Sequence, residues 1–121
     1  MEDEDGEWLE SSPEIVELVH GILKKPLLEG AAEVHLGVVG RAASIKFLIG
    51  GRMANRAAPR KPLLLAAIAR LKWMARRPSD SEGRFKKGMF TLKFEGRLVC
   101  VHVTSTSNVS GEAMALRFAE A

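Results

Sequence analysis

A chain of 121 residues, 46% of them hydrophobic, can build one modest core and not two, so a single domain is expected. Its apolar stretches are broken by charge well short of the ~20 residues that span a membrane, and its first residues are acidic. From these features we expect no membrane insertion and no secretory leader, and we predict a cytoplasmic protein. The single cysteine, Cys100, excludes an internal disulfide.

The net charge of +3 conceals two regions of opposite sign. Residues 1–33 carry ten acids against two lysines, a formal charge of −8, whereas residues 41–97 carry fifteen basic residues against three acids, a formal charge of +12. Within the first region, residues 1–12 are polar and predict a flexible acidic arm. We expect this arm to compete with outside anions or with an acidic partner for the basic region.

A helix is predicted to begin at Pro13. Ser12 suits the N-cap position and Pro13 the first helical position, and apolar residues then recur at helical spacing in "PEIVELVHGIL". The helix should end before Pro26 or kink there, because a proline cannot donate a helical hydrogen bond. This helix opens the single domain expected over residues 13–121.

Hydrophobic periodicity predicts the elements that follow. Two strands lie in "AEVHLGV" and "ASIKFLIGG", and a second helix runs from Pro62 to about Arg77, where Pro78 stops it. After the loop "RPSDSEGRFKKG", the chain forms a hairpin with a tight turn at Glu95 and Gly96, and a last strand lies in "EAMALRF". The predicted fold is α/β (α+β), in the order α-β-β-α-β-β-β, with an antiparallel hairpin near the C-terminus.

Seven short motifs in this order resemble one known family. They are "PEIVELVHGIL", "AAEVHLGV", "SIKFLIGG", "ARLKWMA", "SEGRF", "VCVHVTST" and "GEAMALRF". Taken in order, they are similar to the domain that precedes the motor core in the ATPases of type II secretion and type IV pilus assembly, the GspE and PilB family. The resemblance covers about Pro13 to Phe118 and implies a PAS-like domain.

The resemblance also implies which cations would contact phosphate. In the family, arginines on one face of this domain are thought to reach the phosphates of nucleotide held by the motor core. The matching cations here are Lys46, Arg84 and Arg117. The match is incomplete, because Leu48 falls where the family has a further arginine and His102 replaces the arginine of a late strand. The resemblance therefore implies the fold more strongly than the nucleotide-sensing role.

The sequence offers no catalytic motif. It contains no glycine-rich loop that ends in Gly-Lys-Ser/Thr, which a P-loop needs, and only three residues follow Phe118, so we expect that the chain is not the ATPase itself. His35, Cys100 and His102 could become neighbours if their strands pair, but no close-spaced ligand pair indicates a metal. We therefore expect no enzyme, no catalytic residues, no metal and no cofactor.

One basic segment favours an alternative, nucleic-acid or polyanion binding. The second helix places an aromatic residue among cations, a composition that suits base stacking combined with phosphate contacts. The residues concerned are Arg70, Lys72, Trp73, Arg76 and Arg77. A solvated helix face with a packed tryptophan also explains them, and no DNA- or RNA-binding motif accompanies them.

Together these features predict a non-catalytic adaptor or regulatory module. The resemblance implies a protein partner in the secretion or pilus apparatus, either a full-length motor ATPase or the inner-membrane platform that the motor serves. Any contact with the inner membrane would then be peripheral and would depend on that partner. An unrelated scaffold role stays open.

Overall fold

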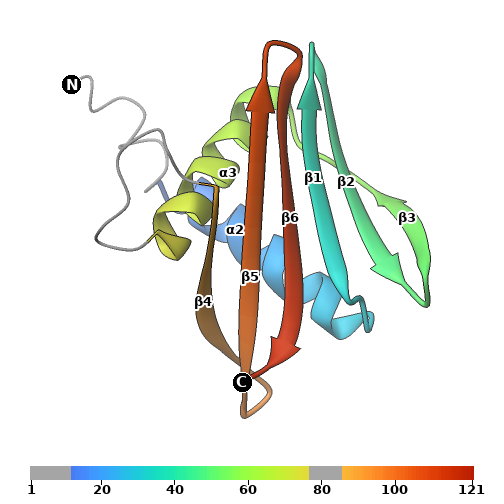
Figure 1. The fold of residues 1–121 in the computed structure, drawn as a ribbon, viewed down its shortest axis with the longest axis vertical. Helices are drawn as coiled ribbons and strands as arrows, with labels where there is room; N and C mark the ends of the chain where they lie inside the picture. Colours follow the sequence, from blue (N-terminus) through green and yellow to red (C-terminus); the bar gives the residue numbers. More distant parts are fainter. Residues whose placement is uncertain (1–11, 77–85) are drawn as a thin grey trace.

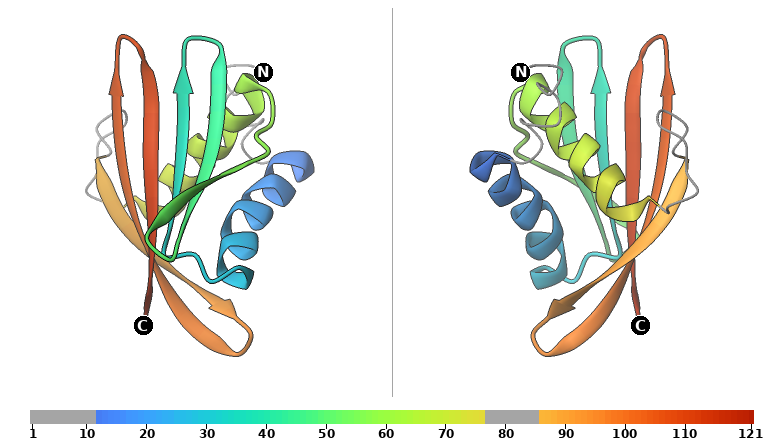
Figure 2. Two further views of the ribbon diagram at one scale, coloured as in Figure 1. Left: turned by 90° about the vertical axis from the view of Figure 1, so that its right-hand side faces the viewer. Right: turned by 90° about the vertical axis from the view of Figure 1, so that its left-hand side faces the viewer.

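Six antiparallel strands form one sheet, and two helices pack on one of its faces (Figure 1, Figure 2). The computed structural model describes residues 12–76 and 86–121. In these ranges, neither helix is long and apolar enough to cross a bilayer. In chain order the elements are α2 (Pro13–Leu28), β1 (Glu33–Val39), β2 (Ala42–Ile49), β3 (Arg52–Arg56), α3 (Lys61–Ala75), β4 (Lys87–Phe94), β5 (Arg97–Asn108) and β6 (Gly111–Glu120).

The two strands at the centre of the sheet are far apart in the sequence. The strand order is β3-β2-β1-β6-β5-β4, and all neighbours are antiparallel. β1 pairs with β2 on one side and with β6 on the other, so that Val34 lies opposite both Phe47 and Leu116. This arrangement confirms the predicted α/β (α+β) class, the PAS-like layout and the antiparallel hairpin, which is β4–β5.

Two details differ from the sequence-based prediction. Arg52–Arg56 forms a sixth strand, β3, so the observed order is α-β-β-β-α-β-β-β. Its residues are mainly polar and exposed because it is an edge strand, so they show no clear alternation. Helix α2 also continues past Pro26 to Leu28, so of the two outcomes predicted at this proline, an end or a kink, the helix does not end there. The Pro26 ring is buried, and its carbonyl oxygen accepts a 2.8 Å hydrogen bond from the backbone N–H of Ala31, so packing and this bond stabilise the last turn.

Two hairpins are closed by tight turns with left-handed backbone. In the β4–β5 turn, Glu95 has a φ of 51° and Gly96 a φ of 79°, and in the β2–β3 turn Gly50 and Gly51 have φ values of 58° and 81°. Positive φ at both central residues defines a type I′ turn, whose twist matches that of the paired strands. The turn predicted at Glu95 and Gly96 is confirmed.

The core lies between the helices and the sheet face that they cover. The four inner strands, β1, β2, β5 and β6, contribute alternate residues to it, because successive side chains of a strand point to opposite faces. The main buried residues are Ile15, Val19, Ile22 and Leu23 of α2, Leu64, Ile68 and Leu71 of α3, Val34, Leu36 and Val38 of β1, Ile45 and Phe47 of β2, Val101 and Val103 of β5, and Met114 and Leu116 of β6. The residues that alternate with these core residues along each strand point away from the helices.

Candidate functional site

The sheet face opposite the helices is the candidate functional site. In the described part of the chain, no helix or strand lies on this side (Figure 2). We call it the open face, and it is formed by the strand residues that alternate with the core. Its central residues are Glu33, His35 and Gly37 of β1, Ser44, Lys46 and Leu48 of β2, His102, Thr104 and Thr106 of β5, and Ala113, Ala115 and Arg117 of β6.

The sheet register brings together two of the three cations that the family resemblance implied. Lys46 of β2 lies opposite His35 of β1, and Arg117 of β6 lies opposite Glu33 of the same strand. Lys46 and Arg117 therefore flank β1 on the open face, and both are exposed. Arg84, the third cation, lies outside the described residues. His102, which replaces a family arginine, lies opposite Arg117 on β5.

The one carboxylate in this central region is held by a histidine. His35 Nε2 lies 2.8 Å from Glu33 Oε1, and since an ionised carboxylate only accepts, the ring N–H is the donor. Both residues point to the open face because they are two positions apart on β1. No hydrogen bond or ion pair joins Lys46 or Arg117 to another described residue. Their charges are therefore available to a partner.

A shallow hollow of about 340 Å³ lies next to these charges. Small residues, among them Gly37, Ala113 and Ala115, leave space over the centre of the sheet, and Lys46 and Met53 line the side toward β2 and β3. A Cβ added to Gly37 would lie 3.2 Å from Ser44 Oγ, so even alanine there would crowd the hollow. The hollow is open and lined by both polar and apolar residues, which suits a side chain of a protein partner better than an enclosed small molecule.

The residues considered for a metal are not gathered into a ligand set. His35 is on β1, whereas Cys100 and His102 are on β5, and β6 lies between the two strands. Among the residues that the structure describes, no group of three histidine, cysteine or acidic side chains could hold a metal ion.

The basic residues predicted around Trp73 do not form one common surface in the structure. Arg70, Lys72 and Trp73 belong to α3, which packs on the sheet face opposite the open face (Figure 2). The Arg70 guanidinium lies 5.7 Å from the centre of the exposed Trp73 ring, a cation–π contact. Lys72 instead forms an ion pair with Glu112 at the start of β6. Arg76 is exposed at the end of α3, and Arg77 lies outside the described residues.

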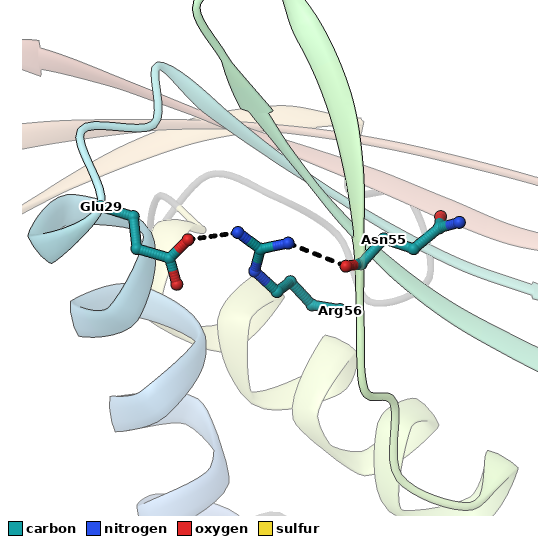
Figure 3. A network of polar contacts seen from close by, with 3 residues as sticks. All are labelled: Glu29, Asn55 and Arg56. Atoms are coloured by element: carbon teal, nitrogen blue, oxygen red, sulfur yellow. Dashed lines mark hydrogen bonds and ion pairs between the residues drawn. The ribbon is translucent and has the colours of Figure 1, made fainter.

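Sequence reasoning missed the contact that holds the edge of the sheet to α2. Arg56 of β3 donates a hydrogen bond to the Glu29 carboxylate at the end of α2 and another, of 2.9 Å, to the Asn55 carbonyl (Figure 3). The hydrogen bond to Glu29 raises the pKa of the Arg56 guanidinium, and the negative charge acts in the same direction. The guanidinium also lies 5.1 Å from the ring centre of Phe47. The Gly50-Gly51 pair before a basic, non-helical segment was the available signal for β3.

Comparisons of the sequence with known proteins show the family of this chain. The sequence model of the family described as "Type II/IV secretion system protein" matches residues 9–121. The type II secretion system ATPase E of Vibrio cholerae is 27% identical over 108 residues, which cover 89% of this chain and 22% of that protein. For the putative type II secretion system protein E of Escherichia coli, the identity is 28% over 108 residues, again 89% and 22% of the two chains.

A third relative covers nearly the whole chain. Type II secretion system protein E of Pseudomonas aeruginosa is 27% identical over 116 residues, which are 96% of this chain and 23% of the relative. The chain thus spans less than a quarter of the length of the curated relatives it matches. The family match, in contrast, extends over most of the 121 residues. The chain belongs to the type II/IV secretion system protein family.

Proposed function

We propose that this chain is a non-catalytic adaptor or regulatory module of a type II secretion or type IV pilus system, and that it binds a motor ATPase or the inner-membrane platform of that motor. The observation that carries the proposal is the open face, where Lys46 lines a hollow, Arg117 lies across β1 from Lys46, and no described element covers either residue. The module acts in the cytoplasm and needs no metal or cofactor for this role.

The composition of the open face supports a protein partner. Lys46, Arg117, Lys87 and Lys93 contribute four positive charges to the face, and Glu33, already bonded to His35, contributes one negative charge. Such a surface attracts an acidic partner at a distance, and the apolar and hydroxyl groups in the hollow then provide close contact. The absence of a Gly-Lys-Ser/Thr loop from the 121 residues supports a role that does not include ATP hydrolysis.

The test is a titration of the purified protein with two partners, a motor ATPase encoded in the same genome and the cytoplasmic part of its platform protein. The double variant Lys46→Glu and Arg117→Glu places two negative charges on the open face and should weaken binding at least about tenfold. Arg70→Glu and Arg76→Glu reverse two charges on α3, away from the open face, and should change the affinity less than about twofold. No binding of either partner, or equal losses in both double variants, would contradict the proposal.

A second candidate function, nucleic-acid or polyanion binding, rests on α3. The favouring observation is the exposed Trp73 with Arg70 beside its ring, because a base can stack on an aromatic ring while a cation contacts phosphate. The ion pair of Lys72 with Glu112 removes one cation from this surface. Retention on heparin or DNA that persists at moderate salt and is lost in Trp73→Ala would favour this candidate.

A further inference from the structure

One end of the sheet is built from two hairpin turns that lie side by side (Figure 1). The backbone N–H of Gly40, in the β1–β2 turn, donates a 3.2 Å hydrogen bond to the carbonyl of Ser110, in the β5–β6 turn. Lys61, at the start of α3, donates a 2.8 Å hydrogen bond from Nζ to the carbonyl of Gly40. We call residues 38–42, 58–61 and 107–111 the paired-turn end. These cross-links hold the two turns in fixed relative positions.

Each turn presents an exposed valine. The side chain of Val39 is 63% exposed and that of Val109 is fully exposed, whereas Val38, one position earlier, is buried in the core. A single exposed apolar residue is ordinary on a protein surface. Two at the tips of neighbouring, cross-linked hairpins make a small apolar projection.

The charge around this projection has one sign. The paired-turn end contains Arg41, Arg60 and Lys61 and no aspartate or glutamate. Arg41 and Arg60 are exposed and have no hydrogen bond or ion pair with other described residues. The N-terminus of α3 adds partial positive charge at the same place. The next acid along β6, Glu112, is already paired with Lys72.

The other end of the sheet has a different electrostatic character. There, Arg56 is paired with Glu29, and Arg97 Nη1 lies 3.3 Å from Glu120 Oε2. Cations at that end are thus partly neutralised within the molecule, whereas those of the paired-turn end are not. The two ends therefore differ in the charge that they present to a flat anionic surface.

We propose that the paired-turn end rests on a bilayer that contains anionic phospholipid. Val39 and Val109 enter the headgroup layer, and Arg41, Arg60 and Lys61 contact the lipid phosphates around them. Anionic headgroups match both features, since they offer negative charge at the surface and apolar chains directly beneath it. Binding by one copy is weak and reversible, and it becomes firm only when several copies act together. This contact lies at the end of the sheet, outside the hollow of the open face, and does not depend on the partner proposed to bind there.

Sedimentation with lipid vesicles tests the proposal on the full chain. Vesicles of phosphatidylglycerol and phosphatidylethanolamine should bind the protein at low ionic strength, and phosphatidylcholine vesicles should not. Two double variants, Val39→Ser with Val109→Ser and Arg41→Glu with Arg60→Glu, should each lower the bound fraction by roughly fivefold or more. Circular dichroism and the thermal midpoint should stay unchanged, because all four side chains are exposed.

Matched variants at the opposite end serve as controls. Leu28, at the end of α2, is 65% exposed, so it is a control for the exposed valines. Arg97, at the start of β5, is the control for the charge reversals. Leu28→Ser and Arg97→Glu should leave vesicle binding within about twofold of the parent protein. Binding to phosphatidylcholine, or equal losses in control and paired-turn variants, would overturn the proposal. So would paired-turn variants that keep vesicle binding and lose a motor ATPase or platform protein, since this end would then be a protein interface.

Discussion

Gly111 is in such close contact with Val38 that no other residue fits at its position. A Cβ atom on Gly111 would lie 1.8 Å from the carbonyl oxygen of Val38 and 2.8 Å from its carbonyl carbon. The contact joins the first residue of β6 to the end of β1, the two central strands of the sheet. Neither backbone can move away without breaking the β1–β6 ladder. The glycine of the "GEAMALRF" motif therefore has a structural explanation.

We expect Gly111→Ala to lower the free energy of unfolding by about 3 kcal/mol or more, because the new methyl group overlaps buried backbone. Gly21→Ala is the matched control. Gly21 lies within α2, and an added Cβ there would have its nearest neighbour, Lys25 Cε, at 3.8 Å. This control should stabilise the protein by about 0.5–1 kcal/mol, since alanine is the better helix former. Chemical denaturation measures both changes, and a neutral Gly111→Ala would contradict the contact.

The ion pair between Lys72 and Glu112 should contribute measurably to stability. The two side chains are only 29% and 20% exposed, so solvent screens their attraction less than at an open surface. A double-mutant cycle with alanine should give a coupling energy of about 1 kcal/mol. The control cycle uses Arg97 and Glu120, whose side chains are 54% and 82% exposed, and should give about 0–0.5 kcal/mol. Equal coupling in the two cycles would show that burial does not strengthen the first pair.

The purified protein should hydrolyse no nucleotide and bind ATP more weakly than micromolar. Lys46 and Arg117 are exposed cations on a sheet face, without the cradle of backbone amides that makes phosphate sites specific. Isothermal titration calorimetry measures the affinity, and micromolar binding would contradict the expectation. If some affinity is found, changing Lys46, Arg84 and Arg117 to alanine should abolish it. Lys93→Ala, at the edge of the sheet, should not.

Removing residues 1–11 should strengthen binding to polyanions. These residues include six acids, which we expect to compete with outside anions for the basic region. The truncated chain keeps Ser12, whose hydroxyl accepts a 3.3 Å hydrogen bond from the N–H of Ile15, so α2 keeps its cap and stability should change by less than about 1 kcal/mol. The salt concentration that elutes each form from heparin measures the effect. We expect the largest difference at low ionic strength, and identical elution would mean that the acids do not compete.

Local patterns in the sequence were sufficient to predict the helices and strands that have a buried face. The alternation of Ile45 and Phe47 with Ser44 and Lys46 places Lys46 on the open face, and the observed strand has this orientation. Strand β3 was missed because its five residues bury little and so have no apolar period to detect. The sequence left open whether the first helix ends or continues at Pro26, because the packing that stabilises its last turn is tertiary.

The candidate site could be predicted only in part. The family resemblance indicated Lys46 and Arg117, but their separation by a single strand follows from the pairing of β1 with both β2 and β6. The basic face predicted around Trp73 was only partly right, for a related reason. Lys72 is next to Trp73 in sequence, but the ammonium group of Lys72 is held by Glu112, which is distant in sequence and close in space. Such long-range contacts leave no local period in the sequence.

The central position of β6 has a consequence for how the protein is made. β1 is synthesised early, but one of its two neighbours in the sheet is formed by residues 111–120. Until these residues leave the ribosome, β1–β2–β3 is a three-stranded meander and β4–β5 a separate hairpin. Each has a strand edge that is free to pair with another chain. Joining them requires contacts between distant residues, which makes the closing step slow. Chaperones that bind nascent chains would therefore have their longest opportunity to act just before β6 appears.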